Sequence, residues 1–390
     1  MRILGIQEDE LKRIDGYNTA LEMERQLELW EEGIETIKTN TDKIRAFLNK
    51  IEEVEGLKIY LVGAGSSAKA AAITENYLRR ITKKEVISIA STTLIENEDS
   101  YILDNSPVLL VSLGGSGNTI EGLEAVEIFK KKGIELYQLL IICNGKGEII
   151  SKYGEDKNSL YIPIPPRTKD KSIAATGEFT LLIEYLLLIF DINNYDYYEE
   201  MFKNIIEDAG RFLKEDIYKS HAVSNKIYDT VAALGTGALN PLASEMCLKI
   251  SELSTGLQRT EFHSMLEFRH GPKLAMNSKC LISFFFSNDS QSIKYELDVL
   301  KECYSNKINS TIVAISMDYD EEIDKNCDYY FYFNKNNFKY SDDSHIVFQY
   351  SLYLQSFAIL NAIRRGSKTD LICESGIVNK VAQGVVIYKR

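Results

Sequence analysis

The chain has 390 residues, of which 45% are hydrophobic and 26% are charged, and its formal net charge at pH 7 is −12. This length exceeds what one hydrophobic core usually serves, so the composition predicts a globular protein of about two domains. The acidic balance argues against a nucleic-acid partner, because phosphate backbones bind to a concentrated basic face.

The first predicted elements are a helical arm and a series of strands and helices. Residues 1–30 are rich in glutamate and predict a helix, not a signal peptide. The longest apolar stretch, residues 181–190, contains Glu184 and is too short to span a membrane, so it predicts a core helix. The first series comprises a strand ending at Gly63, helix 68–81, strand 86–91, strand 107–113, loop 114–119, helix 121–133, strand 139–144, short strand 160–165 and helix 179–190.

A second series repeats this order. The segment TVAALGTGAL, around Gly235 and Gly237, matches IYLVGAGSSA, around Gly63 and Gly65. The repetition indicates a duplicated structural unit. The second series comprises the strand ending at Gly235, helix 239–253, a polar segment up to His270, strand 280–286, loop 287–292, helix 292–305, strand 311–316, strand 329–333 and helix 346–365.

The alternation of short β-branched runs with amphipathic stretches predicts βα units and therefore parallel sheets. The strands are apolar without alternation, as expected when helices cover both faces of a sheet. We therefore predict an α/β fold with two flavodoxin-like lobes, each a parallel sheet flanked by helices, after an N-terminal helical arm. The expected domains are the arm at 1–50, a first lobe at 51–195, a second lobe at 196–376, and a C-terminal segment at 377–390 that closes the site.

The cysteines do not predict a metal site. They are scattered, with no CxxC pair and no close histidine, so we expect buried free thiols in a cytoplasmic protein. No membrane segment is predicted. The six cysteines are Cys143, Cys247, Cys280, Cys303, Cys327 and Cys373.

Two loops of the first half offer donors for a phosphate group. Each follows a predicted strand and precedes a helix, where hydroxyl groups, backbone N–H groups and the positive end of the helix dipole favour an anion. Because neighbouring parallel strands end at the same sheet edge, both loops should meet in one crevice. The predicted ligands are Gly65, Ser66 and Ser67 in GAGSSA, and Ser116, Asn118 and Thr119 in GGSGNT.

Two other interpretations of these loops remain open. Serine, threonine and asparagine also cap helices, so either loop alone is compatible with capping. Gly63, Gly65 and Ala68 satisfy the dinucleotide pattern G-x-G-x-x-A, but the acid that this pattern requires after the second strand is missing. The second half has GTGALN and SNDSQS instead, with Asp289 in place of Gly117. Since an acid repels phosphate, we expect one complete ligand cradle per chain, in the first half.

The second half supplies candidate catalytic groups. Glu245, Lys249 and Glu252 have the spacing i, i+4 and i+7, which puts all three on one helix face. This row is either functional or a solvent-exposed set of salt bridges. His270 stands in the turn FRHGP, where it either moves a proton or is a turn residue hydrogen-bonded to the backbone.

The segments VGAGSSAKAA, SLGGSGNT, EMCLKISELSTG and EFRHGPK resemble the sugar isomerase (SIS) domain. Their order resembles the tandem arrangement of bacterial galactosamine-6-phosphate deaminase/isomerases, also known as tagatose-6-phosphate ketose/aldose isomerases. The resemblance extends from about Thr19 to Tyr388, and the FRHGP element is its most specific part.

The resemblance implies roles for individual residues. Ser66 and Ser67 match the first phosphate and sugar loop, and Ser116 and Thr119 match the second. Glu252 matches the carboxylate that moves a proton between C1 and C2 in related amino-sugar synthases. In that related domain the histidine matching His270 assists ring opening and comes from a neighbouring subunit, which implies a homodimer or higher homo-oligomer with composite sites.

The implied reaction converts galactosamine 6-phosphate to tagatose 6-phosphate and ammonia, without a metal or an organic cofactor. Two alternatives are a simple ketose/aldose isomerase acting on tagatose 6-phosphate or a related sugar, and a non-catalytic phosphosugar sensor. Sensors usually carry a DNA-binding headpiece, and the acidic first 50 residues contain no basic recognition helix.

The sequence also departs from the family. Relatives usually have a basic or amide residue where Gly115 stands. Arg167, Lys169 and Lys171 resemble a family loop near the sugar but also suit a charged surface loop. The synthases use a C-terminal lysine to form an imine. Gln383 stands at that place with Lys380 nearby, so no imine role is assigned.

Overall fold

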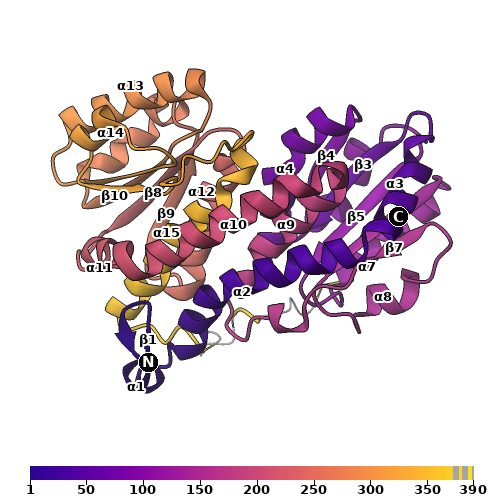
Figure 1. Cartoon of the computed structure of the whole chain (residues 1–390), viewed down its shortest axis with the longest axis horizontal. Helices are drawn as coiled ribbons and strands as arrows, with labels where there is room; N and C mark the ends of the chain where they lie inside the picture. The colour runs from indigo at the N-terminus through magenta and orange to yellow at the C-terminus, as the bar shows by residue number, and fades with distance from the viewer. Residues whose placement is uncertain (372–376, 380–384, 389–390) are drawn as a thin grey trace. The chain divides into compact units, whose positions relative to one another are not determined.

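The computed structural model describes residues 1–371, 377–379 and 385–388 (Figure 1). The chain forms two compact units. The unit that we name the first lobe contains Glu28–Asp170 and Gly177–Glu199, with the described residues after 376. The unit that we name the second lobe contains Met1–Leu27, Lys171–Thr176 and residues 200–371.

The first lobe is built on a parallel sheet with the strand order β4-β3-β5-β6-β7. Strands β3 and β5 are neighbours, with Val62 opposite Ser112, and the interiors of both are buried as the unbroken apolar runs predict. The strands are β3 (Lys58–Gly63), β4 (Val86–Ala90), β5 (Val108–Gly114), β6 (Leu136–Ile142) and β7 (Ser159–Tyr161).

Helices cover both faces of this sheet (Figure 1). On one face, Leu94 of α5 and Phe129 of α7 pack into a cluster with Leu110 and Leu140 of the sheet. Helices α4 and α9 pack against each other, and α4 also contacts β3 and β4. The helices are α3 (Thr41–Glu52), α4 (Ser66–Thr82), α5 (Ser91–Glu96), α6 (Glu98–Tyr101), α7 (Ile120–Lys131), α8 (Glu148–Tyr153) and α9 (Gly177–Phe190), with short 3-10 turns at Pro166–Thr168 and Ile192–Asn194.

The second lobe repeats the arrangement with the strand order β12-β11-β10-β8-β9, also parallel. Helices α13 and α14 lie on one side of the sheet, and α12 packs between β8 and α15 on the other (Figure 1). The elements are β8 (Thr230–Gly235), α12 (Leu239–Leu253), β9 (Arg259–His263), β10 (Cys280–Phe285), α13 (Ser290–Asn306), β11 (Thr311–Ser316), α14 (Glu321–Lys325), β12 (Tyr329–Tyr332) and α15 (Val347–Arg364), with 3-10 turns η4 (Glu267–His270), η5 (Pro272–Asn277) and η6 (Asp343–His345).

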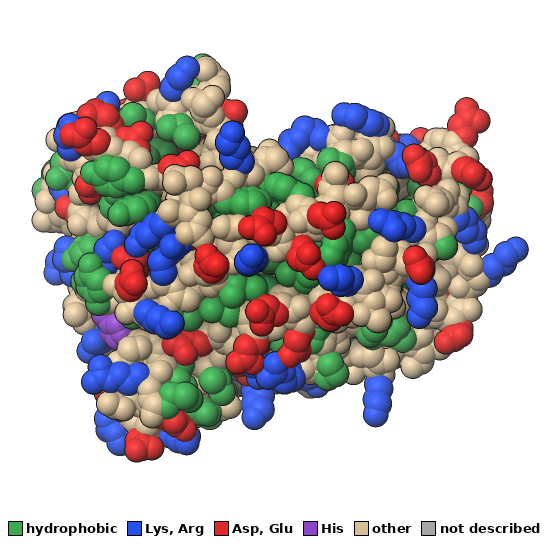
Figure 2. Space-filling view, in the orientation of Figure 1, with side chains coloured by type: hydrophobic (Ala, Val, Ile, Leu, Met, Phe, Trp, Pro, Cys, Tyr) green, Lys and Arg blue, Asp and Glu red, His purple; other side chains and the backbone are tan. Residues whose placement is uncertain are grey.

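The predicted α/β fold with two flavodoxin-like lobes is confirmed, including the helices near the N-terminus. Helix α2 (Tyr17–Thr39) is followed in the first lobe by α3. Two helices precede β8, namely α10 (Tyr195–Arg211) and α11 (Ile217–Ser224). A short π-helix at Phe212–Asp216 joins them. On the face in Figure 2, acidic and basic side chains are interspersed.

Two local predictions were wrong. Residues 1–30 are not one helix, because a hairpin of β1 (Arg2–Ile3) and β2 (Ile6–Gln7) and a short α1 (Glu8–Arg13) come before α2. The hairpin turns at Leu4 and Gly5, whose φ angles are +47° and +77°. The polar segment before His270 contains β9. The pattern missed this partly exposed edge strand, which within the described residues pairs with β8 alone.

Two further expectations concern the cysteines and the membrane. Cys143, Cys247, Cys280 and Cys303 are buried free thiols, as predicted, and Cys327 is a half-buried free thiol. Cys373 lies outside the described residues. Within the described part of the chain, no helix has the length and hydropathy needed to cross a bilayer.

Glu184 is an unusual core residue of the first lobe. Its side chain in α9 is fully buried, and neither carboxyl oxygen has a hydrogen-bond partner among the described residues. It lies against Gly33 of α2, where an added Cβ would overlap the carboxyl group and lie 2.9 Å from Leu181 Cδ1. Burial raises the pKa of Glu184 well above 4.5, because the apolar surroundings disfavour the charged form of this carboxyl group.

We expect Glu184→Gln to remove a pH-dependent decrease in the free energy of unfolding. Above pH 4.5 the unfolded chain releases this proton while the native chain keeps it, so the free energy of unfolding falls with rising pH by up to about 1.4 kcal/mol per pH unit. Urea unfolding at a series of pH values above 4.5 should show the variant gaining stability relative to wild type as pH rises. The exposed Glu199→Gln is the control, and a difference that does not change with pH would contradict this expectation.

Candidate functional site

The loop after β3 is shaped by two glycines. An added Cβ at Gly63 would lie 2.7 Å from Ser67 Cβ and 3.1 Å from Leu113 O, so the loop packs directly on the end of β5. Gly65 has φ +57° at the N-cap of α4, a conformation that glycine adopts without strain. Ser66 and Ser67 therefore begin α4, and both are half-buried.

Hydrogen bonds and close packing hold the loop after β5 in place. The Asn118 N–H donates to Ser116 Oγ at 3.2 Å, and Asn118 Oδ1 accepts from the Glu148 N–H at 2.8 Å. Gly117 has φ +65°, and an added Cβ there would lie 2.8 Å from Ile142 Cγ2. Ser116 and Thr119 are half-buried at the start of α7, so their hydroxyl groups lie at the N-terminus of that helix.

The two loops lie at the same edge of the first-lobe sheet, as predicted. Strands β3 and β5 are adjacent and parallel, and each loop leaves the carboxyl end of its strand. This edge therefore carries four hydroxyl-bearing residues and the N-termini of two helices. The residues are Ser66, Ser67, Ser116 and Thr119.

A carboxylate that the sequence did not reveal accounts for one departure from the family. An added Cβ at Gly115 would lie 2.5 Å from Glu178 Oε2 and 3.0 Å from Glu178 Cδ. The half-buried Glu178, in the first turn of α9, thus occupies the space that a larger side chain at 115 would need. Only glycine fits beside this carboxylate without movement.

The corresponding loop of the second lobe is occupied by the chain's own acids. Asp289 caps α13 by accepting from the N–H groups of Gln291 and Ser292 at 3.2 and 2.8 Å. Asp343 accepts from Ser287 Oγ and from the Asn288 N–H, both at 2.7 Å. In the first lobe, by contrast, Thr119 at the N-cap of α7 makes no side-chain capping bond within the described residues.

A third acidic side chain, that of Glu296, also accepts a hydrogen bond from the second-lobe loop. Glu296 is buried, and its Oε2 accepts from the Ser287 N–H at 2.8 Å. Burial raises the pKa of Glu296 to about 8. Donors that could hold a phosphate are therefore engaged by carboxyl groups here.

The charged row of α12 is buried, so its interpretation as a solvent-exposed set of salt bridges was wrong. The side chains of Glu245 and Lys249 are 0% and 1% exposed, whereas that of Glu252 is 22% exposed. Lys249 Nζ lies 3.3 Å from Glu245 Oε1 and 2.6 Å from Glu252 Oε2. The helix packs against β8, β9 and α15, which explains the burial.

The two carboxylates keep Lys249 charged. Burial alone would lower the pKa of Lys249, but the negative charges of Glu245 and Glu252 outweigh burial and raise this pKa above its usual value. The ammonium group in turn fixes the Glu252 carboxylate. Of the three charged side chains, that of Glu252 is the one that is partly exposed to solvent.

His270 ends the short η4 turn. Gly271 follows with φ +126°, a conformation that only glycine adopts readily, and the buried Phe268 anchors the turn. The His270 side chain is exposed, and no described residue hydrogen-bonds to its ring. The interpretation of His270 as a turn residue held by backbone hydrogen bonds therefore lacks support.

The structure does not place the remaining candidate residues beside the serine loops, Glu252 or His270. Arg167 pairs with Glu28 at 3.0 Å and also with Glu32, as a surface residue would. Lys171 is exposed, although its backbone N–H donates to the buried Glu22 carboxylate. Lys380 and Gln383 lie outside the described residues. Among the residues that the structure describes, no three histidine, cysteine or acidic side chains gather as metal ligands would.

Comparisons with known proteins agree with this architecture. A family model described as the SIS domain matches residues 54–190. A solved structure of a proposed tagatose-6-phosphate ketose/aldose isomerase from Clostridium novyi NT superposes with a TM-score of 0.95, at 32% identity and with 100% of both chains covered. The chain therefore belongs to the sugar isomerase (SIS) domain family.

Two other members of the family are similar to this chain over nearly its whole length. The tagatose-6-phosphate ketose/aldose isomerase of Escherichia coli superposes with a TM-score of 0.84, at 25% identity over 95% of this chain and 96% of that one. The D-galactosamine-6-phosphate deaminase AgaS of Shewanella sp. strain ANA-3 is 29% identical over 389 residues, which cover 99% of this chain and 95% of the relative. Both similarities extend over both lobes.

Proposed function

We propose that this protein is a phosphosugar deaminase/isomerase that converts galactosamine 6-phosphate to tagatose 6-phosphate and ammonia. The observation that carries the proposal is Glu252, an accessible carboxylate fixed by a buried lysine, in a chain similar over nearly its whole length to proteins named D-galactosamine-6-phosphate deaminases. The same relatives support a phosphosugar as the substrate.

The first-lobe loops would hold the phosphate group. Ser66, Ser67, Ser116 and Thr119 supply hydroxyl groups, and the first turns of α4 and α7 supply N–H groups. Local donors suit this protein because its overall charge of −12 does not attract anions. Asp289 and Asp343 occupy the equivalent second-lobe donors, so we expect one phosphate site of this kind per chain.

The Glu252 carboxylate would carry the proton. Once the ring opens, C1 is an aldehyde and C2 bears the amino group and an acidic hydrogen. Glu252 removes the C2 proton to give an enolamine and returns it to C1, which leaves an imine at C2. Water adds at C2, ammonia departs, and the product is the 2-ketose. Lys249 orients the carboxylate throughout and does not touch the sugar.

His270 would assist ring opening by moving a proton at the ring oxygen. We propose that the active protein is a homodimer or higher homo-oligomer in which this histidine serves a partner subunit. The segment around His270 exposes apolar side chains that such an interface would cover, and β9 beside it is an edge strand. These side chains are Leu257 at 67% exposure, Phe262 at 42%, Leu266 at 44% and Leu274 at 73%.

We expect purified protein to release one ammonia for each tagatose 6-phosphate formed from galactosamine 6-phosphate. A coupled ammonia assay run beside chromatographic detection of the ketose tests this directly. Galactosamine without the phosphate is the control and should react poorly, because the loop donors then have no anion to hold. Ketose formation from another sugar phosphate without ammonia would favour the simple isomerase. Binding of phosphosugars without any turnover would favour the sensor.

A further inference from the structure

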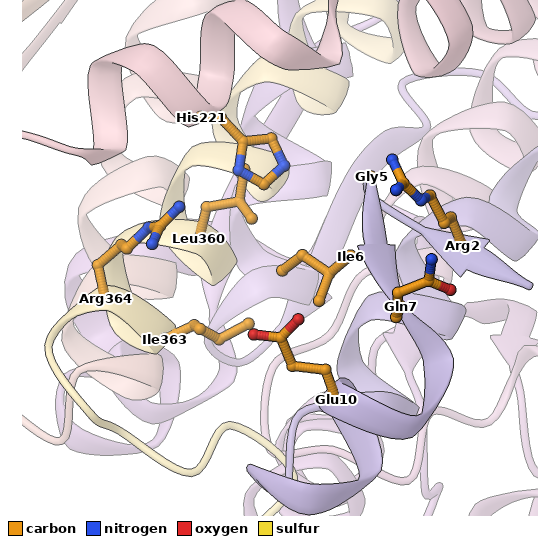
Figure 3. A pocket seen from close by; sticks show the side chains of 9 residues that line it. All are labelled: Arg2, Gly5, Ile6, Gln7, Glu10, His221, Leu360, Ile363 and Arg364. Atoms are coloured by element: carbon orange, nitrogen blue, oxygen red, sulfur yellow. The ribbon is translucent and has the colours of Figure 1, made fainter.

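A cavity of about 260 Å³ lies in the second lobe, among the N-terminal hairpin, α1, α11 and the end of α15 (Figure 3). Its volume is just below the usual range of small-molecule sites, so it suits a ligand smaller than a drug molecule. None of its residues belongs to the candidate site described above. It is lined by Arg2, Gly5, Ile6, Gln7, Glu10, His221, Leu360, Ile363 and Arg364.

The wall formed by the hairpin is held in place. Ile3 and Leu4 are buried, and the Leu4 N–H donates to Glu24 Oε1 at 2.6 Å. His221 Nε2 donates to Leu4 O at 2.7 Å, and an added Cβ at Gly5 would lie 3.1 Å from the same nitrogen. The cavity is thus bounded by a docked hairpin and not by a frayed chain end, so little ordering is needed for a ligand to bind.

The charged groups of the lining are not used elsewhere in the described structure. Arg2, Glu10 and Arg364 form no ion pair with any described residue, whereas Arg211 and Arg269 are each paired with an acid. Figure 3 shows Arg364 extending toward His221, the carboxyl group of Glu10 turned toward Ile363, and Arg2 on the opposite rim beside Gly5.

The lining therefore combines three kinds of contact. Arg364 and Arg2 offer planar donors, which suit phosphate oxygens. Glu10 offers an acceptor that would repel a bare anion but attract an ammonium group. Ile6, Leu360 and Ile363 offer apolar surface for a carbon skeleton. A simple anion would satisfy only part of this set.

We propose that this cavity binds a small organic phosphate that also carries an amine. The phosphate contacts Arg364, the ammonium group contacts Glu10, and Arg2 contributes to the positive potential. The ligand class follows from the lining and does not depend on the proposed reaction. Amino-sugar phosphates belong to this class, so the site would let such a compound bind away from the loops of the first lobe.

Phosphoethanolamine is a suitable probe, because it carries both groups but no sugar that an isomerase could convert. Calorimetry should show binding to the wild-type protein, and hydrogen exchange of the amides in residues 1–10 should slow. Arg364→Gln and Glu10→Gln should each weaken binding about tenfold or more. Arg259→Gln, which changes an exposed arginine of the same lobe, and Ser116→Ala, which changes a first-lobe loop, should leave binding unchanged.

Several results would overturn the proposal. The first is unchanged hydrogen exchange of residues 1–10 when phosphoethanolamine is added. The second is equal affinity of the wild-type and Arg364→Gln proteins for phosphoethanolamine. The third is loss of binding in Ser116→Ala, which would place the probe in the first-lobe loops. Inorganic phosphate binding as tightly as phosphoethanolamine would refute the role of Glu10. Unchanged melting temperatures of the variants would exclude unfolding as the cause of lost binding. None of these results depends on whether ammonia is released from galactosamine 6-phosphate.

Discussion

Replacing Glu252 by glutamine is expected to lower kcat by roughly 10²- to 10⁴-fold, the usual contribution of a positioned general base. The amide has nearly the shape of the carboxylate but cannot accept the C2 proton. The loops that would hold the phosphate lie on β3 and β5, so substrate affinity should change little. Steady-state kinetics should therefore show a loss in kcat with a nearly constant KM.

Isotope exchange adds a readout that a structural role would not affect. In D₂O, wild-type protein should incorporate deuterium at C1 of the ketose as the proton on the carboxylate exchanges with solvent, and Glu252→Gln should do so only at its residual rate. Glu199→Gln, which removes an exposed carboxylate paired with Lys38, is the matched control. A Glu252→Gln protein with near wild-type kcat would rule this carboxylate out as the base.

Replacing Lys249 by methionine is expected to lower the free energy of unfolding by about 3–5 kcal/mol, as removal of one partner from a buried ion pair typically does. The side chain is 1% exposed and lies within 3.3 Å of two carboxylates, one of them fully buried. Methionine fills a similar volume but leaves Glu245 without this counter-charge. The loss should become larger as pH rises, because ionisation of the buried Glu245 carboxylate costs more free energy without the Lys249 ammonium group beside it.

Urea unfolding of the Lys249→Met protein measures this loss. Lys38→Met is the matched control, because Lys38 pairs with Glu199 at 2.9 Å while both side chains are about half exposed, and such pairs contribute about 0–1 kcal/mol. Activity should fall together with stability, since Lys249 orients the Glu252 carboxylate. Equal losses for the two variants would mean that the buried row adds no more than a surface salt bridge.

The fold could be predicted in most of its parts because it is repeated in the sequence. The glycine turns at Gly63 and Gly235 end corresponding strands of two parallel sheets, and the unbroken apolar strands indicated burial on both faces. The edge strand β9 was missed because its partly exposed polar residues have no apolar pattern. The N-terminal hairpin was missed because its strands have two residues each, which is too short for any periodicity to appear.

The candidate site could be predicted only where strand order and helical spacing determine the positions of its residues. The strand order of a βα repeat brings Ser66 and Ser116 to one sheet edge, and helical spacing puts Lys249 and Glu252 on one face. Spacing does not indicate depth, so the burial of this face appeared only with the packing of α12. Glu178 and Asp343 reach the loops from distant parts of the chain, and such contacts depend on tertiary structure alone.

A crystal structure of the Glu252→Gln protein with galactosamine 6-phosphate is the most direct test of the central claim, that one carboxylate moves a proton on a sugar whose phosphate is held by the two serine loops. We predict the phosphate on the hydroxyl and N–H groups of Ser66, Ser67, Ser116 and Thr119, with C1 and C2 about 3 Å from the side chain at position 252 of the same or a partner subunit. A phosphate bound elsewhere, or a residue 252 remote from both carbons, would contradict the claim.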